Sequence, residues 1–438
     1  MLDVNSLVEL LTWKIPAFAF ALGLIIVVHE AGHLAAAKAF AVRVLTFSVG
    51  FGKRLWGFKR GDTDYRISIV PLGGYVRLSG ENPEDEPSDD PREFLNKPRW
   101  QRIVVYLAGP AMNVVLSILL FAGLFMVGIH VNGALELSEI PAVVGGVAEG
   151  SEGAKAGVRK GDRILEVNGK PAESFQDVFF ALVEPGRAAR LQVQRDGRTF
   201  GVTVTPGRVP GEDLPDLAGI YPMNRPEVTS IKVGSPADQA GFLPYDKIVA
   251  VNGRPVLGGG DFVEAIEKLA GQPVRVGIER DGKPLTLSVT PKLDGRVGRI
   301  GVGIGSFRRY PPLRALQESV RHNYRIVQTT VRILGKVITG ELSADATISG
   351  PVKIFEETAR AAKQGFDTLL YLVGFLSISI AFVNLLPIPL LDGGQIVILL
   401  VESVIRRDLS LKVKEYVGYV GLAVIVTLMV MVFYFDIF

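Results

Sequence analysis

Long uninterrupted apolar stretches dominate the pattern of hydrophobic and polar positions along this 438-residue chain. A helix needs roughly 20 apolar residues to cross the hydrocarbon of a bilayer. Four segments reach that length: about Ile15 to Phe40, Ile103 to Ile129, Leu369 to Leu391 and Tyr416 to Phe435. The second and third carry no charged residue, which is rare for buried helices of a soluble protein. The pattern therefore predicts four transmembrane helices.

The charges between these spans predict their orientation. The segment Lys38 to Arg102, between the first two spans, holds 12 Lys or Arg residues. Four more stand between the third and fourth spans, at Arg406, Arg407, Lys412 and Lys414. Cytoplasmic loops carry an excess of Lys and Arg. We therefore expect both loops in the cytoplasm, and both termini and residues 130–365 outside it.

The polar segment between the second and third spans contains an internal repeat. Val167-Asn168-Gly169 recurs 84 residues later as Val251-Asn252-Gly253, and Arg195-Asp196-Gly197 recurs 85 residues later as Arg280-Asp281-Gly282. Asn-Gly and Asp-Gly are signals for tight hairpin turns, and the flanking runs alternate as strands do. The repeat predicts a duplicated α+β domain.

Each copy carries a similar stretch around its Asn-Gly turn. The first reads GDRILEVNG after Ala156-Gly157, and the second reads LPYDKIVAVNG after Ala240-Gly241 and Phe242. These stretches resemble PDZ domains of bacterial proteases, which implies a peptide-binding groove beside an edge strand. Rigid spacer domains that bind no peptide are the alternative.

A metal-binding motif, His29-Glu30-Ala31-Gly32-His33, lies inside the first span. Residues four apart on a helix share one face, so both imidazoles can bind the same ion. Glu30 adjoins the first ligand and can take a proton from metal-bound water. Three ionisable side chains at membrane depth are costly unless function retains them. The motif therefore predicts a zinc site rather than a polar trio that only packs against other helices.

A catalytic zinc site needs a third protein ligand and one position open to water. The chain has no cysteine, and its other histidines, His130 and His322, lie toward the outer side. Asp392 is the best candidate, because Pro387 and Pro389 break the third span just before it and free backbone groups that must line a cavity. An aspartate that only caps a turn is the alternative.

Together these motifs resemble the site-2 protease family of intramembrane zinc metalloproteases. HExxH stands in the first span, NxxPxPxLDG in the third, and the PDZ-like copies lie between the second and third. The resemblance covers essentially the whole chain. It implies that Zn²⁺ is held by His29, His33 and Asp392, and that Glu30 is the catalytic base.

The resemblance also implies a substrate and a setting. Asn384 would help to position the substrate backbone, and Gly109 to Asn113 in the second span would lie near the site. The implied substrates are single-span membrane proteins such as an anti-sigma factor, cut by regulated intramembrane proteolysis in envelope stress signalling. The implied location is the bacterial inner membrane, with the termini and PDZ-like domains periplasmic and the active site toward the cytoplasm.

A β-hairpin is predicted in the first cytoplasmic loop. Residues 54–60 and 65–70 alternate as strands do, around the turn Gly61-Asp62-Thr63-Asp64. Apolar side chains suit the region to dip into the membrane: Phe47, Phe51, Leu55, Trp56 and Phe58. An exposed strand edge could hold an unwound substrate by backbone pairing. An ordinary loop hairpin is the alternative.

Residues 313–338 predict an amphipathic helix, with Leu and Val at helical spacing and Arg and Lys between them. Such a helix either lies on the outer membrane surface or packs against the PDZ-like pair. Gly350-Pro351 separates it from a second short helix that leads into the third span.

The predicted fold class is a polytopic α-helical membrane protein (four transmembrane helices) with a membrane-associated β-hairpin and two tandem PDZ-like α+β domains. Its predicted segments are the first transmembrane helix 1–40, a cytoplasmic loop with the hairpin 41–102, the second transmembrane helix 103–129, the PDZ-like domains 130–210 and 215–305, connecting helices 306–366, the third transmembrane helix 367–392, a cytoplasmic loop 393–415 and the fourth transmembrane helix 416–438.

Composition narrows the functional classes. The net charge of +3 gives no reason to expect nucleic acid as a partner, and the absence of cysteine excludes disulfides and thiolate catalysis. The expected partners are single-span membrane protein substrates and the lipid bilayer. A non-catalytic PDZ-bearing membrane scaffold is an alternative, against which the intact Glu30 argues. A transporter is a weaker one, because the four spans show no inverted repeat.

Overall fold

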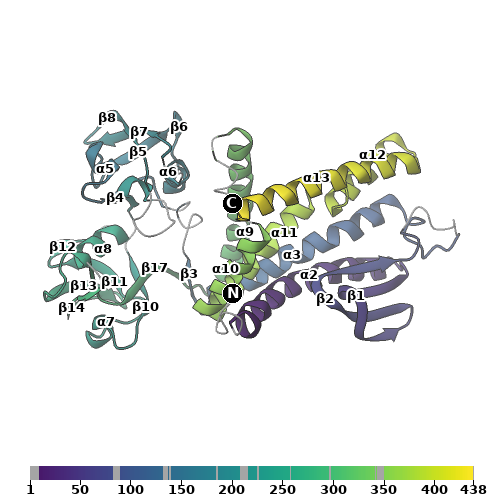
Figure 1. The fold of residues 1–438 in the computed structure, drawn as a ribbon, viewed down its shortest axis with the longest axis horizontal. Helices are drawn as coiled ribbons and strands as arrows, with labels where there is room; N and C mark the ends of the chain where they lie inside the picture. Colours follow the sequence, from purple (N-terminus) through teal and green to yellow (C-terminus); the bar gives the residue numbers. More distant parts are fainter. Residues whose placement is uncertain are drawn as a thin grey trace. The chain divides into compact units, whose positions relative to one another are not determined.

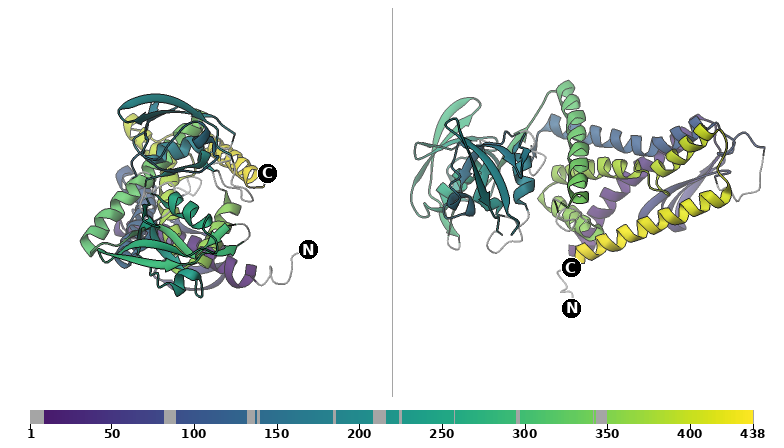
Figure 2. Two further views of the ribbon diagram at one scale, coloured as in Figure 1. Left: turned by 90° about the vertical axis from the view of Figure 1, so that its left-hand side faces the viewer. Right: turned by 90° about the horizontal axis from the view of Figure 1, so that it is seen from above.

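The computed structural model describes residues 9–81, 89–131, 137, 140–183, 186–207, 216–223, 226–256, 258–294, 297–340, 342 and 350–437. The chain divides into two compact units (Figures 1 and 2). The membrane unit comprises Met1–Val127, Tyr310–Gly335 and Thr347–Phe438, and the repeat unit comprises Gly128–Arg309 and Lys336–Ala346.

In the described part of the membrane unit, four helices are long and apolar enough to cross a bilayer. They are α2 (Ile15–Ala39), which continues the π-helical turn η1 (Leu10–Lys14), α3 (Arg99–Val127), α11 (Phe366–Asn384) and α13 (Leu411–Ile437). They correspond to the four predicted spans, and Figure 1 shows them running in one general direction.

Small residues and buried hydroxyl groups hold α2, α3 and α11 together. A Cβ atom at Gly32 of α2 would lie 2.3 Å from the carbonyl oxygen of Ala108 on α3, so only glycine permits this approach. Ser117 of α3 donates to the carbonyl oxygen of Gly374 on α11 at 2.8 Å, and Ser377 of α11 donates to the carbonyl oxygen of Asn113 at 2.9 Å. Close backbone packing and interhelical hydrogen bonds of this kind associate helices in lipid.

Two further helices lie next to the spans. The predicted amphipathic helix forms as α9 (Pro312–Ile338), and both further views in Figure 2 agree with Figure 1 that it runs across the spans. Its buried stripe includes His322 and Asn323, while Leu313 and Val320 are exposed. The second short helix is α10 (Pro351–Gln364), which begins at the predicted proline.

The hairpin is longer than the sequence predicts. Its strands are β1 (Val44–Arg60) and β2 (Thr63–Leu78), joined by a two-residue turn at Gly61-Asp62. Ser48 pairs with both Arg66 and Tyr75, because each strand bends and forms two segments. The pairing places the segments in the order 54–60, 63–70, 44–49 and 74–78. The sheet therefore has two edges, residues 54–60 and residues 74–78.

The third span breaks earlier than predicted. Its helix ends at Asn384 rather than at residue 392, and the segment predicted as the cytoplasmic loop 393–415 contains the helix α12 (Asp392–Ile405). Pro387 and Pro389 prevent the helix from continuing, because proline lacks the amide hydrogen and restricts the residue before it. The chain then folds back so closely that a Cβ at Gly393 would lie 2.3 Å from the carbonyl oxygen of Leu385.

The repeat unit contains two α+β domains, and each begins with the same order of elements: strand, helix, two strands, helix, two strands. The first has the sheet β6-β5-β7-β8, and the second has the sheet β14-β13-β11-β10-β17-β3 with β12 beside β11. The strands of the first are β4 (Val144–Val147), β5 (Arg163–Val167), β6 (Lys170–Pro171), β7 (Ala189–Arg195), β8 (Arg198–Val204) and β9 (Ile220–Pro222), with helices α5 (Glu152–Lys155), α6 (Phe175–Leu182) and η2 (Leu217–Gly219). The strands of the second are β10 (Glu227–Ile231), β11 (Lys247–Val251), β12 (Arg254–Pro255), β13 (Val274–Arg280), β14 (Lys283–Val289), β15 (Lys292–Asp294), β16 (Val297–Arg299) and β17 (Val302–Arg308), with helices α7 (Pro236–Gln239) and α8 (Gly259–Glu267).

The repeated motifs form equivalent turns and ion pairs. Asn168 and Asn252 have positive φ angles of 51° and 48°, as the predicted tight turns require. Arg195 donates to the buried carboxylate of Asp162 at 2.6 Å, and Arg280 donates to Asp246 at 2.7 Å in the second domain. The hydrogen bond to Asp162 raises the pKa of Arg195. Each copy therefore contains the same ion pair to a buried aspartate as well as the same turns.

The boundaries of the two domains differ from the predicted 130–210 and 215–305. Strand β9, predicted in the second domain, pairs with β4 of the first, and Ala218 and Ile220 belong to the core of the first. Strand β3 (Ile129–Val131), at the predicted start of the first domain, pairs with β17 of the second. Strand pairing between distant segments decides these boundaries, and the sequence repeat does not reveal it.

Candidate metal centre

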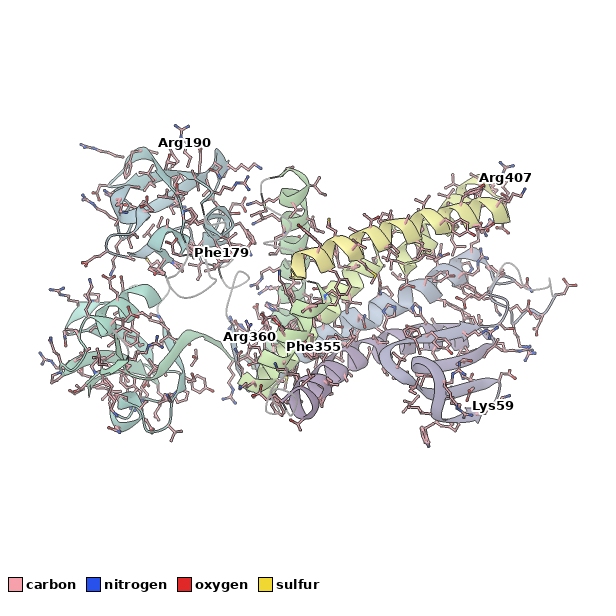
Figure 3. All side chains as sticks on the ribbon, in the orientation of Figure 1. Lys59, Phe179, Arg190, Phe355, Arg360 and Arg407 are labelled. Carbon is pink, nitrogen blue, oxygen red and sulfur yellow. The ribbon has the colours of Figure 1, made fainter. Side chains whose placement is uncertain are left out.

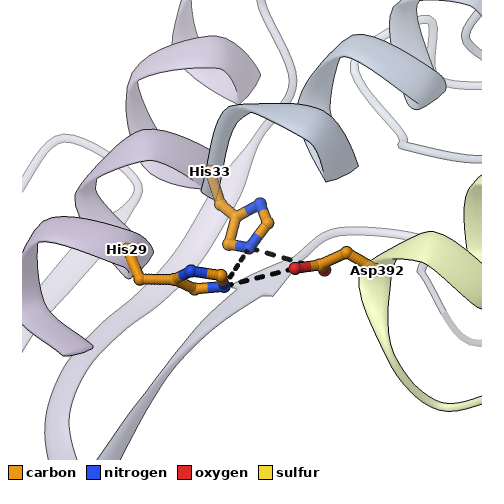
Figure 4. A group of neighbouring side chains, drawn as sticks. All are labelled: His29, His33 and Asp392. Carbon is orange, nitrogen blue, oxygen red and sulfur yellow. Dashed lines mark hydrogen bonds and ion pairs between the residues drawn. The ribbon is translucent and has the colours of Figure 1, made fainter. Parts of the chain in front are cut away.

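Three predicted ligands come together within the membrane unit. His29 and His33 project from consecutive turns of α2, and Asp392 is the first residue of α12 (Figure 4). Their ligand atoms all lie within 4.8 Å of one another, and no other such group of His, Asp or Glu was found among the described residues. The positive N-terminal end of α12 favours a carboxylate at this position.

The distances within this group suit a zinc ion. The Nε2 atoms of His29 and His33 are 3.2 Å apart. Asp392 places Oδ2 3.2 Å from His29 Nε2 and Oδ1 3.6 Å from His33 Nε2. Ligands about 2.0–2.2 Å from a tetrahedral zinc ion are separated by roughly 3.3–3.6 Å. Two imidazoles and a carboxylate are also a donor set that zinc accepts.

Gly109 of α3 keeps space open beside the ligands. A Cβ atom at this position would lie 2.3 Å from His33 Nε2 and 2.8 Å from His29 Nε2. Any larger residue would fill the region toward which both nitrogen atoms point. The predicted element Gly109 to Asn113 therefore lies next to the ligands, and the residues present fit a bound metal ion.

The orientation of His33 is set by a backbone contact. Its Nδ1 atom is 2.8 Å from the carbonyl oxygen of Val105 on α3. A carbonyl only accepts, so Nδ1 carries the proton and the lone pair is on Nε2, as ligation through Nε2 requires. Val105 contributes only its backbone, so no side-chain pattern could have predicted this role.

A cavity beside the three ligands contains the other predicted site residues. It is lined by Glu30 and Asn384, and also by Tyr106 and Glu81. The carboxylate of Glu30 accepts a backbone hydrogen bond from Val76 of β2, and its Cγ atom would be 3.2 Å from a Cβ at Gly74. The edge segment 74–78 of the hairpin therefore forms one wall of the cavity, directly beside Glu30.

The sequence analysis did not predict Glu81 or Val105 as site residues, and it placed Asn113 near the site without a role. Burial raises the pKa of the Glu81 carboxyl group, and the nearby charge of Glu30 acts in the same direction. Asn113 is fully buried, with Nδ2 3.2 Å from Nδ1 of His29. The resemblance placed Asn113 near the site, but its contact with His29 arises only from the packing of α3 on α2.

The remaining two histidines are His322 and His130. His322 is buried on α9, with Nε2 3.1 Å from the hydroxyl of Tyr371 and its ring against Phe121. It therefore has a structural role within the bundle and takes no part in the metal group. The backbone of His130 lies in β3, and its side chain is outside the described part of the structure.

The chain is similar to known proteases along nearly its whole length. The chain is 31% identical to the regulator of sigma-E protease of Escherichia coli strain K12, over 95% of this chain and 96% of that protein. It is 30% identical to the regulator of sigma E protease of Salmonella typhi, with the same coverage. A Ralstonia nicotianae protein named for a proposed zinc metalloprotease activity is 31% identical over 96% of this chain and 97% of its own length.

Two further comparisons concern the fold and the family. A solved PDZ domain from Listeria monocytogenes covers 18% of this chain and 86% of its own, at 19% identity and a TM-score of 0.17. The sequence description of peptidase family M50 matches residues 17–428, which include the HExxH motif, the repeats and Asp392. With that match and relatives of 30–31% identity along nearly the whole chain, the protein belongs to peptidase family M50.

Proposed function

We propose that the protein is a zinc metalloendopeptidase of the site-2 type, which cuts single-span membrane proteins within or near their spanning segments. The observation that carries the proposal is the group His29, His33 and Asp392 on helices of the membrane unit, two of the three within a helix apolar enough to span a bilayer. Membership of family M50 and relatives named as zinc metalloproteases agree with it.

The protein's own residues would divide the chemistry as follows. His29, His33 and Asp392 hold the ion, and a bound zinc ion acts as a Lewis acid that makes water a nucleophile near neutral pH. Glu30 adjoins the ligands without belonging to the group of three, so its carboxylate stays free to accept the proton of the attacking water. The same group then donates that proton to the leaving amine. Such general acid–base assistance is typically worth about 10²–10⁴ in rate.

The walls of the cavity suit an extended substrate. A helical segment hides its peptide bonds, so it must unwind before water can attack. Segment 74–78 is an edge of the hairpin sheet and lies beside Glu30, and an edge strand offers backbone groups for pairing. Asn384, the last residue of α11, lines the same cavity and could hydrogen-bond the substrate backbone there. This edge, rather than the predicted segments 54–60 and 65–70, is the proposed site of strand addition.

The proposed setting is a bacterial inner membrane. Lys59 and Arg407 lie toward the end of the spans that carries the hairpin and the metal group, and Arg360 lies toward the other end (Figure 3). With the excess of Lys and Arg in the first loop, the positive-inside rule assigns the metal end to the cytoplasmic side. The PDZ-like domains and both termini would then be periplasmic. Because two relatives are named regulators of sigma-E, we propose a membrane-bound anti-sigma factor as substrate and envelope stress signalling as the process.

The alternative function is a non-catalytic membrane scaffold that binds peptides through its PDZ-like domains. The two functions differ in whether a covalent product forms. We would purify the wild type, Glu30→Gln and Asp392→Ala, measure zinc content, and express each with a tagged single-span membrane protein. Glu415→Gln is the matched control, because Glu415 lies on α13 and bonds only to Tyr419 among the described contacts.

Under the proposal, wild type and Glu415→Gln hold about one zinc ion and yield a shortened product. Glu30→Gln keeps zinc but forms product at least about 100-fold more slowly, because an amide cannot accept the proton. Asp392→Ala loses most of its zinc. A wild-type protein that holds no zinc and cuts none of the tested substrates would support the scaffold instead.

A further inference from the structure

The imidazole ligand His29 has a side-chain partner that the proposed mechanism does not use. Asn113 is 0% exposed, and its side-chain amide lies 3.2 Å from Nδ1 of His29. The backbone of Asn113 is held by Ser377 of α11, which donates to its carbonyl oxygen at 2.9 Å. The amide therefore has little freedom to move away from the imidazole.

The protonation of His29 depends on which end of the amide faces it. With Nδ2 toward the ring, the amide donates and Nδ1 must carry the lone pair, which leaves a proton on Nε2. A protonated Nε2 cannot ligate an ion. The Nε2 atom of His29 nevertheless points at His33 Nε2 and Asp392 Oδ2, each 3.2 Å away.

Exchanging the two ends of the amide removes this conflict. The oxygen and nitrogen ends are nearly equal in size, so a half-turn of the amide leaves the packing unchanged. Oδ1 then accepts a hydrogen bond from Nδ1–H of His29, and the lone pair moves to Nε2. No hydrogen bond is lost, because Oδ1 is buried without a partner among the described residues in the first orientation.

We propose that Asn113 is a positioning residue that holds His29 in the tautomer able to bind zinc. The inference rests on the proposed zinc site. Val105 performs the same task for His33 with a backbone carbonyl, so α3 orients both imidazoles of α2. Hydrogen-bond partners of metal-bound histidines typically contribute about 10–100-fold to metal affinity.

The test compares the zinc affinity of purified full-length variants, measured by competition with a chromophoric chelator in detergent. Asn113→Leu keeps the volume but removes the acceptor, and we expect it to bind zinc about 10–100-fold more weakly. Asn113→Asp restores an acceptor and should recover affinity to near the wild-type value. Ser117→Ala removes another fully buried polar group one turn further along α3, away from the ligands, and should leave zinc affinity unchanged.

The same variants loaded with Co²⁺ supply a spectroscopic readout. Asn113→Leu should alter the visible cobalt spectrum, whereas Ser117→Ala should not, even if both lower thermal stability. The inference is overturned if Asn113→Leu binds zinc as tightly as the wild type, or if Asn113→Asp binds as weakly as Asn113→Leu. A wild-type protein without zinc affinity would instead contradict the proposed zinc site itself, so the two failures are distinguishable.

Discussion

Gly109 of α3 faces His33 of α2 so closely that a Cβ atom on Gly109 would stand 2.3 Å from the Nε2 atom of His33. His33 cannot simply turn aside, because its Nδ1 is bonded to the carbonyl oxygen of Val105 on the same helix as Gly109. A single methyl group at this point must therefore displace either the imidazole or the helix. The packing of α2 against α3 therefore also fixes the geometry of the metal group.

The first prediction follows from this contact. Gly109→Ala should lose most of the bound zinc and nearly all proteolysis, because the methyl group occupies the space that the Nε2 atoms face. Gly123→Ala is the matched control, since Gly123 lies on the same helix and its Cβ would have no atom within 4 Å. Zinc content per purified chain is the measurement. Equal zinc content in the two variants would show that the ligands do not need this space.

The second prediction concerns the edge of the hairpin sheet. Val76→Pro removes an amide hydrogen from segment 74–78, the one that donates to Glu30 in the substrate-free protein. It should slow cleavage of a helical transmembrane substrate more than cleavage of a short unstructured peptide. The ratio of the two rates is decisive, because losing the Val76 contact to Glu30 would slow both reactions alike.

Lys59→Pro provides the control for this experiment, at the opposite edge of the same sheet (Figure 3). It should leave the ratio of rates unchanged. If Val76→Pro lowers both rates by the same factor, strand addition at segment 74–78 is wrong and the strand serves only to hold Glu30.

The third prediction concerns the first repeat domain. Deleting residues 143–223 removes β4 together with β9, so the second domain should remain folded around its own core. If the repeats limit which substrates reach the site, this variant should also cut proteins with bulky outer domains that the wild type leaves intact.

A deletion of residues 130–210, at the boundaries the sequence suggests, is the informative comparison. It removes part of β3 and leaves β9 without its partner strand, exposing Ala218 and Ile220. We expect it to aggregate or unfold at lower temperature than the 143–223 deletion, as measured by thermal unfolding in detergent. Equal thermal stability of the two deletion variants would contradict the pairing of β9 with β4 and of β3 with β17.

The fourth prediction concerns a buried ion cluster at the C-terminal end of α12. The carboxylate of Glu402 is fully buried and accepts hydrogen bonds from Lys414 Nζ at 2.8 Å and from the Leu409 amide at 2.9 Å. Arg102 lies 3.5 Å away. Glu402→Gln leaves the buried Arg102 and the half-buried Lys414 without their counter-charge, which should destabilise the membrane unit by about 3–5 kcal/mol.

The measurement is the thermal midpoint in detergent, with Glu415→Gln as control. Glu415 bonds to Tyr419 within α13, so its substitution should change stability little. A midpoint for Glu402→Gln equal to that of the control would show that the cluster does not hold α12 and α13 in place.

Features that depend on neighbouring residues could be predicted from the amino-acid sequence. Apolar runs of about 20 residues predict spans whatever their partners, and the spacing of His29 and His33 places both rings on one face of any helix. The Asn168-Gly169 and Asn252-Gly253 turns follow from the tolerance of Asn and Gly for positive φ. These interactions are local, so α2 and the two turns form as predicted.

Features that join distant segments could not be predicted in this way, because they depend on how the chain packs. The chain folds back after Asn384 and starts α12 at Asp392, and no periodicity marks that helix as separate from the apolar run before it. The pairing of segment 44–49 with two other segments makes 74–78 the edge beside Glu30. The roles of Asn113 and Val105 also arise only where α3 packs on α2, because a side chain or carbonyl acquires a hydrogen-bond partner only when packing brings the two groups together.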